Sequence, residues 1–150
     1  MADLRDLYQE VILDHHKKPR NFHKIEQANR QADGFNPLCG DKLSVYMQIE
    51  NGVIRDIGFV GAGCAISTAS ASMMTESLKG KTEGEAKAIF ERFHQLVTNH
   101  SEPQPDPASM GKLAVFSGVR EYPVRVKCAT LAWHTMRAAM EERQETVATE

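Results

Sequence analysis

The chain has 150 residues and a mass of 16.7 kDa, which is the size of one ordinary domain. With 18 basic and 20 acidic residues, it lacks the excess positive charge that nucleic acid or an anionic lipid surface would attract. No apolar stretch is long enough to cross a membrane, and the first residues do not resemble an export signal. We therefore expect one cytosolic domain over residues 1–150.

The first half of the sequence predicts a helix and a β-hairpin. Apolar residues at helical spacing predict an amphipathic helix from Asp3 to about Lys17, which ends on His15 and His16. We expect these histidines at the surface, because a cationic histidine suits the end of a helix dipole. Residues 16–34 show no clear periodicity and predict a connecting loop, with room for a short strand near its end. Alternating apolar residues over 43–49 and 53–60, joined by an Asn-Gly pair, predict the hairpin.

The second half predicts helices. A strand that ends in Gly-Ala-Gly turns at Cys64 into a helix that ends at Lys79-Gly80. A capping-box spacing and an apolar stripe predict the next helix, from Thr82 through Glu85, Ala86, Ile89, Phe90, Phe93, Leu96 and Val97.

Prolines break the chain over 99–107, and a short helix that starts near Asp106 and Pro107 should end near Gly118. Pro123 opens a last helix to about Arg143, followed by a frayed tail over about 144–150. This order predicts an α+β fold in which a small antiparallel β-sheet packs against helices.

Three cysteines are an odd number and too few for a disulfide framework. Each one stands where a loop meets a helix or strand: Cys39 before the first hairpin strand, Cys64 at a helix N-terminus, and Cys128 close behind Arg125 and Lys127. These positions predict a lowered thiol pKa at all three cysteines.

Zinc takes four ligands, and the three thiols with Asp41, two residues beyond Cys39, would make such a set. Three thiolates and a carboxylate leave a divalent site with a formal charge of about -2, and Lys127, Arg125 and Lys42 are candidates to compensate it. A hard carboxylate is foreign to a soft thiolate site, so the mixed ligand set predicts a site that opens.

Other interpretations remain open at this point. The sequence has no Cys-x-x-Cys pair, and free cysteines commonly pack in cores. Gly61 and Gly63 resemble the start of a dinucleotide-binding loop, but the third glycine is missing. A cysteine–histidine hydrolase would need a partner histidine, and no spacing favours one of the six.

The same motifs, taken together, resemble those of a known family. They are Leu7-Tyr8-x-x-Val11-Ile12-x-Asp14-His15, Pro19-Arg20-Asn21, Asn36-Pro37-x-Cys39-Gly40-Asp41, Gly61-x-Gly63-Cys64-Ala65-Ile66-Ser67 and Arg125-Val126-Lys127-Cys128-Ala129-Thr130-Leu131-Ala132-Trp133. The chain resembles the SufU branch of the IscU/NifU N-terminal family, whose proteins take part in iron–sulfur cluster biogenesis.

The resemblance implies the family's α+β fold and a Zn²⁺ site made by Cys39, Asp41, Cys64 and Cys128. It implies a sulfurtransferase that takes persulfide sulfur from a SufS-type cysteine desulfurase onto Cys39, for downstream SUF assembly components. A histidine of the desulfurase would enter the zinc shell and release Cys39. The alternative is an IscU-like scaffold that holds iron or a [2Fe-2S] cluster on the same ligands.

Three departures favour the sulfurtransferase. The scaffold branch has a histidine where this chain has Lys127, and its Leu-Pro-Pro-Val-Lys motif corresponds here to Glu121-Tyr122-Pro123-Val124-Arg125. The stretch over about 100–119 resembles the insertion that marks the SufU branch.

Overall fold

The protein is described by a computed structural model that covers residues 4–98, 111–116, 119, 122–142 and 146–148. The elements in chain order are α1 (Leu4–Lys17), β1 (Arg30–Asn36), β2 (Asp41–Glu50), β3 (Val53–Ala62), α2 (Ala65–Leu78), α3 (Glu83–Thr98), α4 (Pro123–Met140) and β4 (Val147–Ala148). Strands lie in the order β3-β2-β1-β4, and β1, β2 and β3 pair antiparallel. The predicted α+β fold with an antiparallel sheet against helices is confirmed.

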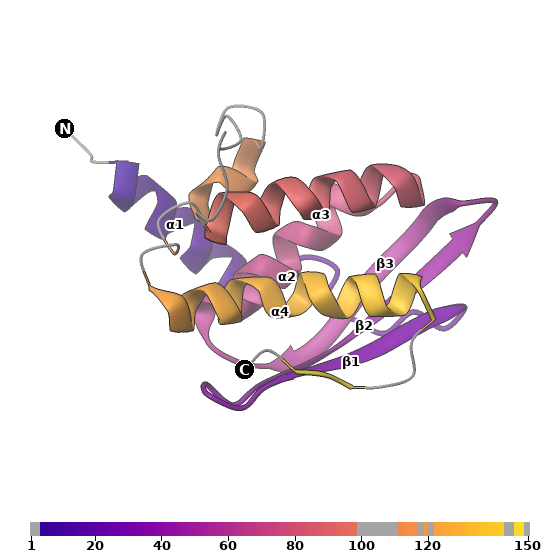
Figure 1. Cartoon of the computed structure of the whole chain (residues 1–150), viewed down its shortest axis with the longest axis horizontal. Coiled ribbons are helices and arrows are strands. Elements are labelled where there is room, and N and C mark those ends of the chain that lie inside the picture. Colours follow the sequence, from indigo (N-terminus) through magenta and orange to yellow (C-terminus); the bar gives the residue numbers. More distant parts are fainter. Residues whose placement is uncertain (1–3, 99–110, 117–118, 120–121, 143–145, 149–150) are drawn as a thin grey trace.

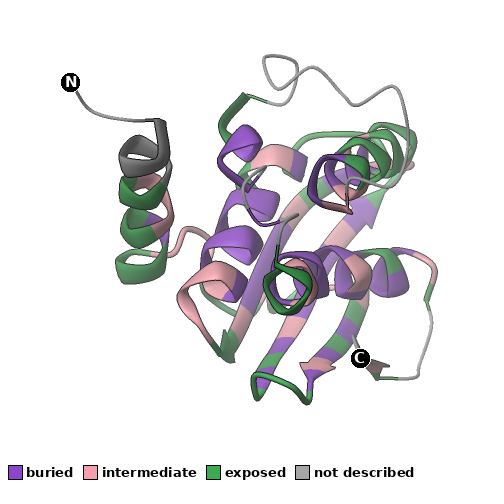
Figure 2. Cartoon of the chain, turned by 60° about the vertical axis from the view of Figure 1, so that its left-hand side comes forward, coloured by how far each residue is buried: buried purple, intermediate pink, exposed green. Residues whose placement is uncertain are grey.

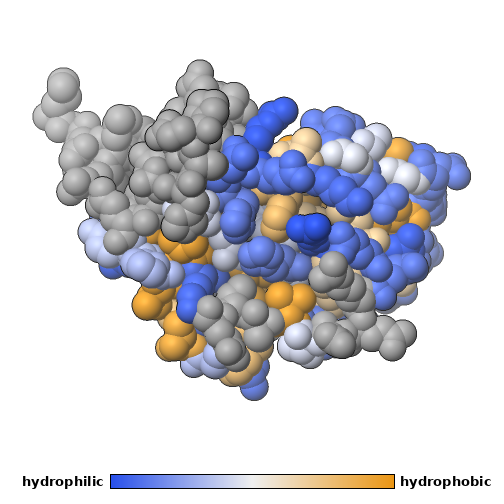
Figure 3. All heavy atoms as spheres, in the orientation of Figure 1, coloured by the Kyte–Doolittle hydropathy of each residue, from blue (hydrophilic) through white to orange (hydrophobic). Residues whose placement is uncertain are grey.

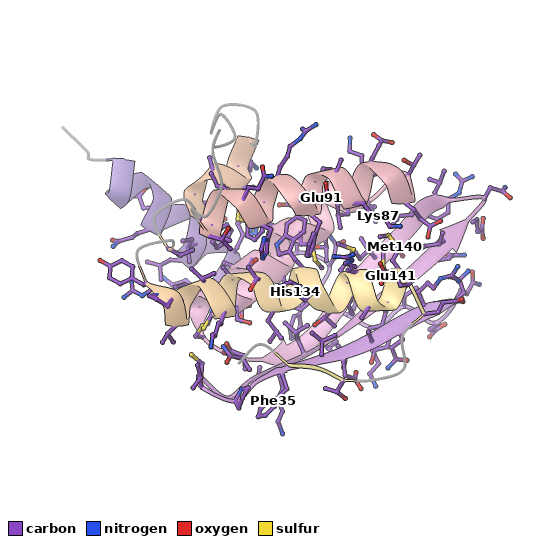
Figure 4. The ribbon with its side chains drawn as sticks, in the orientation of Figure 1. Phe35, Lys87, Glu91, His134, Met140 and Glu141 are labelled. Atoms are coloured by element: carbon purple, nitrogen blue, oxygen red, sulfur yellow. The ribbon has the colours of Figure 1, made fainter. Side chains whose placement is uncertain are left out.

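The helices cover one face of the sheet (Figure 1). Helix α4 packs on β1 and β2, α2 packs on β3, and α1 lies against α2. Apolar side chains of β2 alternate inward, as the predicted hairpin requires, and Phe35 of β1 lies on the opposite face (Figure 4). Buried residues therefore concentrate between the sheet and the helices (Figure 2), where Trp133 stacks on Phe93 with ring centroids 4.6 Å apart.

Local sequence explains the predicted elements. Asn51 and Gly52 have φ values of 54° and 75°, the positive angles of a two-residue hairpin turn. At the start of α3, the Glu85 N–H donates to Thr82 Oγ1 at 3.1 Å, and the Thr82 N–H donates to Glu85 Oε1 at 3.2 Å. This is the reciprocal capping box that the spacing predicted.

Two segments differ from their predictions. The segment predicted as a loop contains β1, whose inward positions are Ala32, Gly34 and Asn36. Small and polar residues give a weak alternation pattern, and this is why the sequence left room for a short strand here without giving its bounds. In the tail predicted to fray, β4 pairs in parallel with β1, because the outer edge of β1 offers free backbone groups.

The remaining bounds agree with the predictions where the structure describes them. Residues 111–116 form 3₁₀ turns of the expected short helix, whose predicted start at Asp106 lies outside the described residues. Helix α4 ends at Met140, three residues before the predicted end at about Arg143. Among the helices described, none is long and apolar enough to cross a lipid bilayer.

The surface position predicted for His15 is wrong. Its side chain is buried between α1 and α2, with Nδ1 2.7 Å from Ser72 Oγ and Nε2 3.6 Å from Glu76 Oε1. Burial lowers the pKa of His15, so this histidine connects two helices as a neutral ring.

Candidate metal centre

The first predicted ligand lies in the turn between β1 and β2. Asn36 pairs with Asp41 across the hairpin, and residues 37–40 form the loop that carries Cys39. The Gly40 N–H donates to the Asn36 carbonyl oxygen at 2.8 Å, and Gly40 has a φ of 73°, which favours glycine. The loop thus returns the chain so that Asp41 begins β2 on the inner face of the sheet.

The other two cysteines belong to helices. Cys64 is the N-cap of α2, and its Sγ accepts a hydrogen bond from the Ser67 N–H at 3.4 Å. Cys128 is buried near the start of α4, which Pro123 begins. Both helices direct their N-terminal ends, where the helix dipole is positive, toward the β1–β2 loop (Figure 1).

The structure brings the predicted ligands together. One ligand atom from each of Cys39, Asp41 and Cys128 lies within 4.8 Å of the other two. The Sγ atoms of Cys39 and Cys128 are 3.2 Å apart. Cys64 is not within this group, but its Sγ lies 4.0 Å from Asp41 Oδ2. Cys64 therefore adjoins the group beside Asp41.

Asp41 is held in place by burial and by a hydrogen bond. Its side chain is fully buried, and its Oδ1 accepts the Cys64 N–H at 2.8 Å. Cys39 is the exposed cysteine and lies on a loop, whereas Cys64 is half-buried and Cys128 is buried. Of the four predicted ligands, Cys39 is therefore the most accessible from solvent, and Asp41 is the most enclosed.

Thiol acidity differs between the cysteines. A hydrogen bond with Cys128, together with the Ser67 N–H, lowers the pKa of Cys64 to about 7 despite its burial. The prediction for Cys128 is wrong in direction. The hydrogen bond with Cys64, and then burial, raise the pKa of Cys128, because it acts as the donor in a water-poor site.

The predicted cations lie at different positions around the site. Arg125 is exposed, with its guanidinium carbon 4.6 Å from the centre of the Tyr122 ring, and Lys127 is half-buried. Charge compensation by these two residues stays a prediction. Lys42 does not face the site, because it alternates with Asp41 on β2 and lies over Phe35 on the other side of the sheet.

The prediction named Asn36 only as part of a motif, although its side chain is buried against the ligands. Its Nδ2 lies 3.5 Å from Cys128 Sγ and 3.5 Å from Asp41 Oδ2. One indication in the sequence was that Asn36 stands directly before Pro37, in the motif that also contains Cys39 and Asp41.

The donors agree with the chemistry of a thiolate-rich metal site. Two thiols and a carboxylate converge, and a third thiol adjoins the carboxylate. Sulfur and carboxylate oxygen are zinc ligands, and four such donors make a complete tetrahedral set. Asp41 and Cys128 belong to β2 and α4, Cys64 is the N-cap of α2, and Cys39 lies in the short loop between paired strands, so the arrangement is a consequence of the fold.

Comparison with known proteins identifies the family. The model of the NifU-like N-terminal domain matches residues 7–129. The chain belongs to this family.

Family members with similar sequences carry two different functional names. The chain is 36% identical to the iron–sulfur cluster assembly scaffold protein IscU of Streptococcus pyogenes serotype M1, over 93% of this chain and 86% of that protein. It is 35% identical to the zinc-dependent sulfurtransferase SufU of Bacillus subtilis, over 95% of each chain. Among solved structures, an iron–sulfur cluster assembly scaffold protein for the SUF system from Fervidobacterium islandicum superposes with a TM-score of 0.82. That structure is 34% identical and covers 91% of this chain and 98% of its own.

Proposed function

We propose that this protein works in iron–sulfur cluster assembly as a zinc-dependent sulfurtransferase that accepts persulfide sulfur from a SufS-type cysteine desulfurase. The observation that carries the proposal is the arrangement of the three thiols. The exposed thiol of Cys39 lies on a loop, next to two less accessible thiols and a buried carboxylate. A sulfur acceptor needs one thiol that a partner protein can reach, held beside groups that fix it.

In the proposed reaction, the Cys39 thiolate attacks the outer sulfur of a persulfide on the partner's cysteine. The S–S bond of that persulfide breaks, its inner sulfur leaves as a thiolate, and a new S–S bond forms on Cys39. The exchange is redox-neutral and needs no added oxidant. Bound zinc would supply Lewis-acid stabilisation that keeps its thiol ligands deprotonated near neutral pH.

The proposed reaction also needs zinc ligands that stay in place and positive charge near the thiolates, and residues of this chain provide both. Asp41, Cys64 and Cys128 are the ligands that would stay in place, because their elements are packed in the fold. We assign Arg125 and Lys127 to compensation of the negative charge on the ligands and on the incoming persulfide.

The surface around Cys39 suits a protein partner. Leu38, Tyr122 and Val124 are exposed by 59%, 49% and 50%, and hydrophobic surface gathers around the start of α4 (Figure 3). Exposed apolar residues beside Cys39 and at the start of α4 are typical of a docking site for another protein.

A second candidate function has specific support. The name of the Streptococcus relative is that of a scaffold, and the same donors would bind iron or a [2Fe-2S] cluster. Anaerobic purification with metal analysis and visible absorption separates the two functions. Stoichiometric zinc without charge-transfer bands supports sulfur transfer, whereas a stable cluster that moves to an apo-protein supports the scaffold.

The direct test uses Cys39→Ala with the cognate desulfurase and L-cysteine. We expect the wild-type protein to raise sulfide and alanine turnover and to gain one sulfur atom by mass spectrometry, and the variant to gain none. Urea unfolding of the zinc-free proteins provides the control, because a variant that has lost only its acceptor thiol should unfold at the same urea concentration as the wild-type protein, whereas a variant that is inactive because it is misfolded should not. Full sulfur uptake by Cys39→Ala would assign the acceptor to another thiol.

A further inference from the structure

Asn36 is a buried polar residue that contacts both the acceptor loop and the candidate ligands. It is the last residue of β1, and its side chain is fully buried. Its Oδ1 accepts the Leu38 N–H at 3.2 Å, and its backbone carbonyl oxygen accepts the Gly40 N–H at 2.8 Å. One residue therefore holds the loop of Cys39 at two points.

The orientation of the Asn36 amide follows from these contacts. Since Oδ1 faces a backbone donor, the amide nitrogen must face the opposite direction. There Nδ2 lies 3.5 Å from Cys128 Sγ and 3.5 Å from Asp41 Oδ2. The first distance is ordinary for an N–H donor to sulfur, whereas the second is long for a donor to oxygen. The thiol of Cys128 is thus the main acceptor.

We propose that Asn36 is a positioning residue of the metal centre, which donates a hydrogen bond to the Cys128 thiolate while it anchors the loop of Cys39. The inference rests on the proposed metal site. A water-poor site with several anionic donors is stabilised by neutral N–H donors that share the thiolate charge. Hydrogen bonds to metal ligands also set their orientation and their donor strength.

The chain offers a matched control for this role. Asn29 precedes the other end of β1, and its side chain also makes two hydrogen bonds, to the Ile49 carbonyl oxygen at 2.7 Å and from the Ile49 N–H at 2.9 Å. The Asn29 amide therefore stabilises the sheet through two hydrogen bonds to the Ile49 backbone, and it makes no hydrogen bond to the candidate ligands. Asn29→Ala removes a comparable pair of bonds from the residue directly before the same strand.

The experiment measures zinc affinity by competition with a chromophoric chelator, and the sulfur-to-metal charge-transfer band of the Co²⁺ form. We expect Asn36→Ala to weaken zinc binding by about 10- to 100-fold, the usual effect of losing a hydrogen bond to a ligand. The Co²⁺ band should move to lower energy, because a thiolate without its donor is a stronger electron donor. Asn29→Ala should change neither.

Asn36→Asp makes the test sharper. It has nearly the same size and keeps the acceptor for the Leu38 N–H, but it places an anionic oxygen beside Asp41 and Cys128. We expect it to lose more zinc affinity than Asn36→Ala. Circular dichroism and urea unfolding of the zinc-free variants show whether each one is folded.

The outcomes separate the inference from the proposed function. If the wild-type protein binds no stoichiometric metal, the metal site fails, and with it the proposed function. If the wild-type protein binds zinc and Asn36→Ala matches it in affinity and in Co²⁺ spectrum, only the role of Asn36 is overturned. A loss of affinity with an unchanged spectrum, equal to that of Asn29→Ala, also overturns it, because it reflects general destabilisation.

Discussion

Gly63 tests whether the position of Asp41 decides the properties of the site. A Cβ atom at Gly63 would lie 2.6 Å from Asp41 Oδ1 and 3.1 Å from Asp41 Cγ. These contacts are too short, so Gly63→Ala must displace the carboxylate. Asp41 has little room to move, because it is buried and its Oδ1 holds the Cys64 N–H at 2.8 Å. The alanine therefore breaks this hydrogen bond or strains the turn into α2.

The expected cost is about 1–3 kcal/mol in the free energy of unfolding of the zinc-free protein, the usual penalty for overpacking a tight site. Zinc affinity should fall as well, because one ligand is displaced. Gly84→Ala is the matched control, since its nearest neighbour would be Thr82 Oγ1 at 3.9 Å. Alanine there lies within α3 and should stabilise the protein by up to about 1 kcal/mol.

Urea unfolding followed by circular dichroism measures the stability, and chelator competition measures the zinc affinity. If Gly63→Ala is as stable as the wild-type protein and binds zinc equally well, then the fixed position of Asp41 is not required and the reasoning is refuted. A loss of equal size in Gly84→Ala would also refute it, because the effect would then belong to any added methyl group.

Two further predictions concern buried polar groups. Ser70→Ala removes the acceptor of the Trp133 Nε1–H, whose nitrogen lies 3.1 Å from Ser70 Oγ, and should lower the free energy of unfolding by about 1–3 kcal/mol. Fluorescence of the single tryptophan during urea unfolding measures this change. An unchanged free energy of unfolding would show that the hydrogen bond contributes nothing to stability. Burial, reinforced by His94 and Arg137, lowers the pKa of His134 from 6.5 to about 4. The unfolded chain then binds a proton that the folded chain does not, so the free energy of unfolding should decrease as the pH falls from about 6.5 to about 4, by up to about 1.4 kcal/mol per pH unit. The His134 ring faces α3 (Figure 4), where it contacts Phe90. His134→Gln should make the dependence of the unfolding free energy on pH shallower. An identical pH dependence in both proteins would contradict the assignment of this effect to His134.

Local patterns predicted the elements that local sequence determines. The Asn51-Gly52 turn and the capping box at Thr82 depend on residues within four positions of one another, and both are present. Strand β1 was left as an open possibility without bounds, because its inward positions include Gly34, which packs against Thr135 of α4. A helix contact of this kind leaves no periodic pattern in the strand itself.

The candidate site was predictable in composition but not in geometry. The motifs named the three thiols and Asp41, yet the high pKa of Cys128 depends on Cys64 and Cys39, and Cys39 lies 89 residues away in the chain. The buried position of His15 depends on Ser72, which is 57 residues away. Burial and electrostatics of this type arise only when distant elements pack, and no sequence window contains them.

The donors of the candidate metal centre come from three separate segments: the β1–β2 loop, the start of α2 and the start of α4. An ion held by all of them would act as a removable cross-link between the N-terminal sheet and the last helix. Because the unfolded chain cannot present these donors together, the ion would raise the melting temperature in proportion to the logarithm of its free concentration. Release of Cys39 would detach only the loop and leave the ties between the sheet and both helices intact. In the proposed reaction, the protein would thus free the Cys39 thiol without loosening its core.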